Sequence, residues 1–311
     1  MCTHNRAKTL STTLSSFSEQ IVPPNLSWEL IVVDNRSSDN TRDLVESFAR
    51  NAPFPVRYLF EGTLGKSMAL NTGVSNAYGD IVAFTDDDVF LHPEWLTMLN
   101  RDFEEFGCIG IGGRVIPVWT QPKPEWLEMK GQQAIVNFDL GEEPKVTTVP
   151  PLGANCAFRK SVFAKYGLFR TDLGPAGDRR GMTCEDTEFA QRVIRGHEKI
   201  VYSPRAIVYH PVAPHRTTKA FFQTWYYYDG RSSVRANQSP DNSVHYFGIP
   251  RWMYRGALAN GMLWMLSCDS KQRFQYKLST YRGLGRMVEA FQLAHAAGHR
   301  GTSLFRKLQR S

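Results

Sequence analysis

Residues 81–88 read Ile-Val-Ala-Phe-Thr-Asp-Asp-Asp, so an apolar run ends in three consecutive carboxylates. Short apolar runs bounded by polar residues are typical of buried strands. Three adjacent carboxylates repel one another, which costs stability unless a cation compensates. Oxygen ligands at the carboxyl end of a strand suit Mg²⁺ or Mn²⁺, and open α/β sheets bind their ligands at that end. Asp86, Asp87 and Asp88 therefore predict a divalent metal site, and the alternative is a solvated acidic turn before the next helix.

Predicted strands and helices alternate on both sides of this run. Apolar runs predict strands, and apolar residues spaced three and four apart predict helices. The predicted strands are 30–33, 56–60, 81–84, 109–118 and 199–202, and the predicted helices are 41–52, 66–77 and 93–106. Such alternation is typical of βαβ units, so we expect an α/β fold with one mostly parallel central sheet flanked by helices.

The amino end departs from this alternation. Thr9–Gln20 indicates a helix, yet only eight residues precede it. Sheets of this class usually begin with a strand, so we expect the chain to start at the carboxyl end of its first strand. That strand would then be largely missing.

Charge is distributed unevenly along the 311 residues. Residues 1–215 carry 22 Lys and Arg against 26 Asp and Glu, whereas residues 216–311 carry 15 against 4. All of the net charge of +7 therefore belongs to the last third, whose apolar spacing is helical. We predict one α/β domain over 1–215 and a basic helical region over 216–311.

Cysteine usage and hydropathy limit the compartment. The five cysteines form no CxxC pair, which excludes a recognisable zinc site and argues against a disulfide framework. No apolar stretch reaches the roughly 18 residues that cross a bilayer, and no secretory signal opens the chain. We therefore expect a cytoplasmic protein.

Two more features of the first domain could contact a nucleotide. Asp34 ends an apolar strand and could accept hydrogen bonds from a nucleobase or ribose, although it could equally be the turn residue of the loop 35–40. The loop 61–66 reads Glu-Gly-Thr-Leu-Gly-Lys and leads into a predicted helix. Helix amino ends favour anions, so Lys66 could approach a diphosphate there. The spacing of a Walker loop is absent.

Two later features could contribute to catalysis. The segment 183–188 opens a predicted helix with three acids, and Asp186 among them is a candidate general base for an acceptor hydroxyl. Acids in a first helical turn also simply stabilise the helix dipole, which is the alternative. His210 ends a predicted strand and is either a metal ligand or a structural hydrogen-bonding residue.

In their order and spacing, these residues resemble the family 2 glycosyltransferases of the GT-A fold. The matching segments are 2–6, 33–35, 65–67, 71–73, 79–80, 86–88, 153–155, 185–186 and His210. The resemblance covers roughly residues 1–235. It implies a Rossmann-like GT-A domain with a nucleotide-sugar half over about 1–118 and an acceptor half over about 119–215.

The resemblance also implies a role for each candidate residue. The nucleotide and its sugar would be bound by Thr3, His4, Asp34, Lys66, Asp86 and Asp87. The remaining candidates would be the metal ligands Asp88 and His210, the catalytic base Asp186, and the acceptor-side residues Asn155 and Glu185. The implied reaction is an inverting transfer from a nucleotide-diphosphate sugar, with Mn²⁺ or Mg²⁺ as cofactor. The implied acceptor is a polysaccharide, a glycolipid or a lipid-linked glycan.

Two other functions compete with this one. A metal-dependent sugar nucleotidyltransferase would share the sheet and the cation, but it normally needs a glycine-rich phosphate loop near its start, and residues 1–20 contain no glycine. A non-catalytic nucleotide-sugar or nucleic-acid binding protein is the second. The acidic balance of residues 1–215 argues against a nucleic-acid partner.

The basic region 216–311 contains Trp252, Tyr254, Trp264 and Phe274, which we expect to be exposed. Basic helices with aromatic residues are typical of proteins that bind an anionic membrane surface. We therefore predict a peripheral contact with the cytoplasmic face of a membrane through 216–311. The alternative is a helical cap on the catalytic domain with its basic residues in water.

Overall fold

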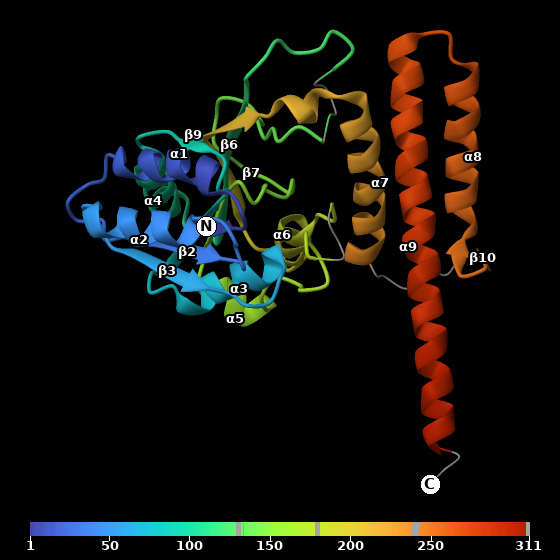
Figure 1. Ribbon diagram of the computed structural model, residues 1–311, viewed down its shortest axis with the longest axis horizontal. Coiled ribbons are helices and arrows are strands. Elements are labelled where there is room, and N and C mark those ends of the chain that lie inside the picture. Colours follow the sequence, from blue (N-terminus) through green and yellow to red (C-terminus); the bar gives the residue numbers. More distant parts are fainter. Residues whose placement is uncertain (129–131, 133, 178–180, 238–242, 309–311) are drawn as a thin grey trace. The chain divides into compact units, whose positions relative to one another are not determined.

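The computed structural model describes residues 1–128, 132, 134–177, 181–237 and 243–308, and the side chains of these residues up to 296. The described residues form two compact units (Figure 1). The second unit comprises Pro124–Glu128, residues 181–184 and the chain from His215 onward, and the first unit comprises the remainder. All five cysteines are free, as expected for a chain without a disulfide framework.

The first unit begins with a parallel three-stranded sheet in the order β1-β2-β3. Its elements are β1 (Cys2–Thr3), α1 (Ala7–Ser18), β2 (Leu30–Asp34), α2 (Thr41–Asn51), β3 (Val56–Phe60) and α3 (Lys66–Asn76). Leu30, Val32 and Val33 are all buried, which is the pattern of a strand covered on both faces. The strands and helices predicted between residues 30 and 77 are confirmed to within one residue.

A second, six-stranded sheet has the order β4-β8-β6-β9-β5, with β7 paired to β9. Its strands are β4 (Ile81–Thr85), β5 (Phe90–Leu91), β6 (Gly110–Trp119), β7 (Lys145–Val146), β8 (Asn155–Arg159) and β9 (Ile200–Val212). Only β6 and β9 pair in parallel. The α/β class is confirmed, but the single, mostly parallel sheet is wrong, because β8 returns antiparallel between β4 and β6 and no ladder joins β2 to β4.

Three helices pack on this second sheet: α4 (Trp95–Phe106), α5 (Ser161–Tyr166) and α6 (Glu185–Arg195). Trp95 and Phe103 of α4 join one buried apolar cluster with residues of β6, β8 and β9. Phe163 of α5 and Phe189 of α6 belong to another, and their rings stack with centroids 4.8 Å apart. These clusters hold the ends of β4 and β9 in fixed positions, and those ends carry the candidate metal ligands.

A cavity of about 640 Å³ lies beside the short strand β1. Cys2 and Thr3 pair only with Val33 and Asp34, the last two residues of β2, so the strand expected to be largely missing is present over two residues. The cavity is lined mainly by apolar residues, including most of β2 and the whole of β4. Among the described strands, β4 pairs only with β8, so its other edge faces this cavity without a ladder.

An added strand should fill this cavity and stabilise the first unit. We expect four apolar, β-branched residues placed before Met1 to raise Tm by about 5–10 °C. Burial of an aliphatic side chain contributes about 1.5–3 kcal/mol, and ordering a residue costs about 1–2 kcal/mol, so the net gain is about 2–4 kcal/mol. Calorimetry of this variant against one extended by Gly-Ser-Gly-Ser measures the effect. Equal Tm values for the two extensions would contradict it.

The second unit is helical, as predicted from residue 217 onward. Its elements are a 3₁₀ helix (Pro214–Thr217), α7 (Lys219–Ala236), the hairpin strands β10 (His245–Tyr246) and β11 (Ile249–Pro250), α8 (Arg251–Leu266) and α9 (Ser270–Leu308). The long helix α9 packs against both α7 and α8 (Figure 1). Glu289 of α9 is fully buried and forms ion pairs with Arg231 and Arg235 of α7, so the two helices are joined by charge as well as by apolar contact.

Of the four aromatic residues expected to be exposed in the second unit, Tyr254 and Trp264 are half-buried. Trp252 is exposed, whereas Phe274 is buried. The Phe274 ring packs edge-on against Trp126 at 5.1 Å, and the Lys219 ammonium lies 5.5 Å from its centroid. The expectation of an exposed Phe274 is therefore wrong. No helix in the described part of the chain is both long enough and apolar enough to span a bilayer.

Candidate active site

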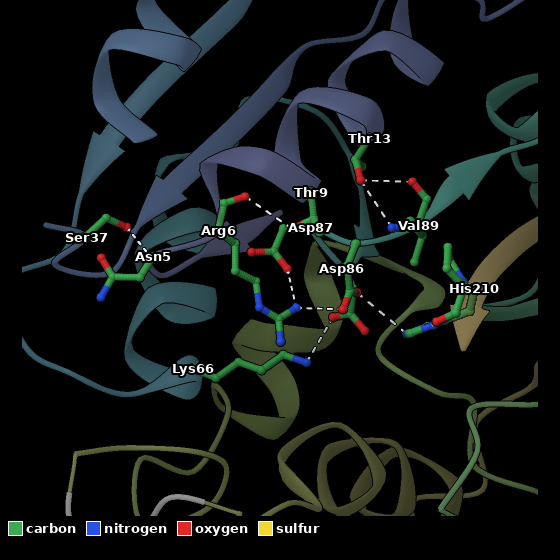
Figure 2. Close-up of polar contacts among 12 residues, drawn as sticks. Asn5, Arg6, Thr9, Thr13, Ser37, Lys66, Asp86, Asp87, Val89 and His210 are labelled. Atoms are coloured by element: carbon green, nitrogen blue, oxygen red, sulfur yellow. Dashed lines mark hydrogen bonds and ion pairs between the residues drawn. The ribbon is translucent and has the colours of Figure 1, made fainter. Parts of the chain in front are cut away.

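Hydrogen bonds within the first unit hold the Asp86–Asp88 turn at both ends. Before it, the Thr85 hydroxyl donates to the carbonyl of Ala154 at 3.0 Å. After it, the Thr13 hydroxyl donates to the carbonyl of Val89 at 2.9 Å and accepts from its N–H at 3.1 Å (Figure 2). The three carboxylates therefore leave the end of β4 from a turn whose backbone is fixed relative to the sheet and to α1.

Asp86, Asp88 and His210 form a group that could hold a metal ion. Each offers one ligand atom, and the three atoms lie within 4.8 Å of one another. The Nε2 of His210, at the end of β9, is 3.6 Å from Asp88 Oδ1. The other ring nitrogen lies 3.1 Å from the carbonyl of Pro211, a contact that requires a proton on Nδ1 and leaves Nε2 as the ligand. Two carboxylates and an imidazole suit a divalent cation such as Mn²⁺.

The structure thus brings together the two predicted ligands, Asp88 and His210, and adds Asp86. The resemblance to the family 2 glycosyltransferases predicts instead that Asp86 binds the nucleotide and its sugar. Residues 86 and 210 are far apart in sequence, and only the pairing of β9 with β5 and β6 brings His210 to this edge of the sheet.

Arg6 bridges two of the carboxylates (Figure 2). Its Nη1 donates to Asp87 Oδ1 at 2.9 Å and to Asp88 Oδ2 at 2.7 Å. Arg6 belongs to one of the segments that carry the resemblance, but the sequence predicts no role for it, because nothing local predicts a contact between residues 6 and 87. Arg6 therefore neutralises the Asp88 carboxylate through Oδ2, whereas Oδ1 of the same carboxylate lies near His210, so a metal ion at Asp88 would compete with Arg6 for its negative charge.

Removal of the Arg6 guanidinium should therefore tighten the binding of Mn²⁺ alone. An ion pair made by a half-exposed side chain is worth up to about 1 kcal/mol, so we expect the Kd of Arg6→Gln for Mn²⁺ to fall about fivefold. Calorimetric titration without nucleotide measures this change. Lys8→Gln is the matched control, because it removes the same charge from an exposed position on α1. Equal Kd values for the two variants would contradict the competition.

Lys66 lies between two acids at the start of α3. Its Nζ donates to Asp86 Oδ1 at 3.0 Å and lies 3.3 Å from Glu185 Oε1. Burial opposes the charge on Lys66, but Asp86 and Glu185 raise its pKa well above that of a free lysine. Burial would raise the pKa of Asp86, yet Lys66 and His210 lower it to about 2. The site therefore holds a lysine ammonium beside an ionised candidate metal ligand, an arrangement that suits a diphosphate bound to a metal ion.

The residues predicted for the nucleobase and ribose lie at the ends of β1 and β2. Thr3 is buried and pairs with Asp34, while His4 is exposed and its Nδ1 lies 2.7 Å from the carbonyl of Asn35. Both oxygens of the buried Asp34 are engaged, one by the N–H of Ser37 and one by the hydroxyl of Tyr58, each at 2.8 Å. Asp34 thus has the contacts of a turn residue, and nucleotide binding by these three residues stays a prediction.

Asp186 is the second residue of α6, and backbone donors hold its carboxylate. The N–H groups of Gly153 and Thr187 donate to it at 2.6 and 2.7 Å. A Cβ at position 153 would lie 2.9 Å from Asp186 Oδ2, so only glycine permits this close approach. Asp186, Asp86, Lys66 and Glu185 line one small cavity of about 10 Å³. The candidate base therefore lies in the same part of the first unit as the metal ligands.

Asn155 pairs with Thr85 in the ladder between β4 and β8, but its side chain makes no described hydrogen bond to these groups. Its side chain is fully buried, and Oδ1 accepts from the indole N–H of Trp95 at 2.8 Å. Its Nδ2 donates to the carbonyls of Arg114 and Ala206, both at 2.8 Å. These contacts tie β8 to α4, β6 and β9, and they engage every polar atom of the side chain. The predicted place of Asn155 on the acceptor side gains no support from them.

Known proteins share this chain's sequence pattern and its fold. A family model described as glycosyl transferase family 2 matches residues 1–167. The succinoglycan biosynthesis protein ExoM of Rhizobium meliloti is 27% identical over 236 residues, which cover 76% of this chain and 73% of that protein. The glucosyl-dolichyl phosphate glucuronosyltransferase of Haloferax volcanii is 25% identical over 225 residues, which cover 70% and 69% of the two chains.

The solved structure of the mannosyltransferase PcManGT from Pyrobaculum calidifontis, a complex with GDP-Man and Mn²⁺, is similar in fold. The TM-score is 0.55 at 16% sequence identity, and the match covers 97% of this chain and 78% of the other. At this identity the likeness supports the GT-A fold and carries no residue role from one chain to the other.

Proposed function

Because the chain belongs to glycosyl transferase family 2 and is a glycosyltransferase, we propose that it transfers its sugar at the carboxyl end of β4 with a divalent cation held by Asp86, Asp88 and His210. The observation that carries this proposal is the convergence of those three ligand atoms within 4.8 Å, next to Lys66 and in the same unit as Asp186. The donor is a nucleotide-diphosphate sugar, and the cation is Mn²⁺ or Mg²⁺.

The protein's own groups account for the departure of the nucleoside diphosphate. A cation held by Asp86, Asp88 and His210 would supply positive charge to the departing diphosphate. Lys66 provides a second positive charge that remains ionised at neutral pH. Arg6 lies on the other side of the same carboxylates and becomes available to the phosphates when it leaves Asp88. Lys66 is in place before the leaving group becomes negative, so its charge can stabilise the leaving group without reorganisation of the site.

Asp186 is the proposed general base. The acceptor hydroxyl is a weak nucleophile, so a carboxylate that takes its proton as the new bond forms lowers the barrier. The two backbone donors at Gly153 and Thr187 fix the direction of this carboxylate. Attack from the side opposite the leaving diphosphate inverts the anomeric carbon. Glu185, the first residue of α6 and the one before Asp186, pairs with Lys66, and burial raises the pKa of Glu185.

The proposed acceptor is the hydroxyl of a glycan, carried on a polysaccharide, a glycolipid or a lipid. Two relatives support this range, since one is named for succinoglycan biosynthesis and the other for transfer to a glucosyl-dolichyl phosphate. A lipid-linked acceptor would explain a contact of the region 216–311 with the cytoplasmic face of a membrane. The rival sugar nucleotidyltransferase and the non-catalytic binding protein lose their support, because the matched family transfers sugars.

A donor screen tests the proposal. The chain is incubated with UDP-, GDP- and dTDP-sugars and Mn²⁺, and nucleoside diphosphate is measured with and without EDTA. We expect slow release from a subset of donors, suppressed by EDTA. Release of nucleoside monophosphate or pyrophosphate would indicate nucleotidyl chemistry, and no metal-dependent release from any donor would contradict the proposed site.

A further inference from the structure

One helix of the second unit exposes an apolar face. Residues 256–266 of α8 contain no charged residue. Leu258, Met265 and Leu266 have exposed fractions of 68, 72 and 71%, and Met262 and Leu263 are exposed as well. Isolated exposed apolar residues are ordinary, but five within nine positions of one helix form a patch that needs an explanation.

The opposite side of α8 is the side that packs. Met253 clusters with Ala290 of α9, and a Cβ built on Gly283 of α9 would lie 3.3 Å from Ala257. The Lys277 ammonium of α9 lies 5.2 Å from the ring centroid of Trp264. Positions 253, 257 and 264 share one side of the helix, whereas 258, 262 and 266 are spaced by four residues along the other. The exposed apolar face therefore points away from α9.

Basic residues flank this face at both ends. Arg251 and Arg255 lie on the same stripe as Leu258 and Met262, one and two turns before them, and both are exposed. Beyond the end of α8, Lys271 and Arg273 are exposed in the first turn of α9, and Lys271 also lies 3.5 Å from the exposed carboxylate of Glu128. Between residues 244 and 288 the sequence holds seven Lys and Arg and one acid, Asp269. The Asp269 carboxylate accepts two backbone N–H groups at the start of α9.

We infer that this face of α8 lies in the interfacial layer of an anionic lipid bilayer, with its axis along the surface. A helix of 16 residues is about 24 Å long, shorter than the hydrocarbon core, so it lies on the membrane and does not cross it. The apolar stripe enters the acyl boundary, and Arg251, Arg255, Lys271 and Arg273 contact lipid phosphates. A second copy of the chain fits this face less well, because its own cations would approach the same stripe.

This inference refines the membrane contact proposed above and depends on none of the transfer chemistry. It differs from the sequence-based prediction for 216–311 as a whole, because it assigns the contact to one face of one helix. It also predicts two separable contributions, one from the apolar stripe and one from the flanking cations.

Vesicle flotation of the full chain tests the inference. Vesicles of phosphatidylcholine with about one third phosphatidylglycerol are compared with pure phosphatidylcholine, at low and high salt. At low salt, we expect recovery with the anionic vesicles to be about tenfold higher than recovery with pure phosphatidylcholine. Leu258→Gln with Leu266→Gln should lower recovery about tenfold, and Arg251→Gln with Arg255→Gln should remove most of the salt dependence.

The matched control is Ile21→Gln with Val146→Gln. These first-unit residues have exposed fractions of 64 and 63%, close to those of Leu258 and Leu266, and recovery should stay at the wild-type level. Equal recovery of the Leu258/Leu266 variant and the wild type would overturn the inference. So would a wild-type chain that stays in solution, or a dimer in light scattering that only this variant loses. Donor hydrolysis by the same samples separates this test from that of the proposed function, because it needs neither membrane nor α8.

Discussion

Replacement of Asp186 with asparagine is expected to lower the transfer rate by about 10³-fold while leaving the Kd for donor and Mn²⁺ unchanged. The amide cannot take the proton of an acceptor hydroxyl, and loss of a general base typically costs 10²–10⁴-fold. The side chain keeps its size, and its one remaining oxygen can still accept one of the two backbone N–H groups that hold Asp186, so the start of α6 should stay in place. Single-turnover transfer measures the rate, and titration of donor with Mn²⁺ measures the binding.

Asp80→Asn is the control for this experiment. Asp80 is an exposed acid directly before β4, at the opposite end of that strand from the metal ligands. The Asp80→Asn enzyme should transfer the sugar at the wild-type rate. An Asp186→Asn enzyme that also transfers at that rate would remove Asp186 from the role of base. Weak donor binding by Asp186→Asn would instead indicate that the carboxylate acts by holding Gly153 and the strand it leads into.

Replacement of Asp88 with alanine is expected to abolish metal-dependent transfer, again by about 10³-fold, through the loss of cation binding. Asp88 is the residue at which the proposed cation, His210 and Arg6 meet. Without its carboxylate, Asp86 and His210 cannot hold a divalent cation at this site, and Mn²⁺ binding should weaken together with transfer. Calorimetry with Mn²⁺ and the dependence of the rate on its concentration are the two measurements.

The two substitutions should therefore have different effects on binding and on transfer. Asp186→Asn keeps Mn²⁺ and donor binding and loses transfer, whereas Asp88→Ala loses all three. Asp80→Asn again serves as the control, since it removes one carboxylate without touching the ligand group. A wild-type activation curve for Asp88→Ala would show that the cation is bound elsewhere.

Local sequence predicts the elements of the first unit well. The run that ends at Asp34 forms β2 because apolar side chains at four successive positions can only be covered between two layers. The helices 41–52 and 66–77 follow from apolar spacing in the same way. Where prediction fails, the missing information is pairing: no local pattern tells that β8 enters between β4 and β6 in the antiparallel sense.

The candidate site likewise contains residues that the sequence predicts and residues that only contacts in space identify. Asp86–Asp88, Asp186 and His210 carry recognisable chemistry at the ends of predicted elements, and so they were found. The sequence predicts no role in the site for Arg6 or Gly153, because their importance depends on contacts with residues far away in sequence. Arg6 contacts an aspartate 82 residues away, and Gly153 contacts one 33 residues away. Phe274 was expected to be exposed because its aromatic neighbour Trp126 lies far away in sequence.

The run of three aspartates after an apolar strand was determined by the sequence alone, and with it the expectation of a divalent cation. Like charges on adjacent residues need compensation wherever the chain places them. Only the tertiary structure decided what compensates Asp86, Asp87 and Asp88: Arg6 from the loop after β1, Lys66 from α3 and the ring of His210 from β9. Electrostatic and coordinating contacts depend on distance in space, which strand order determines and sequence separation does not.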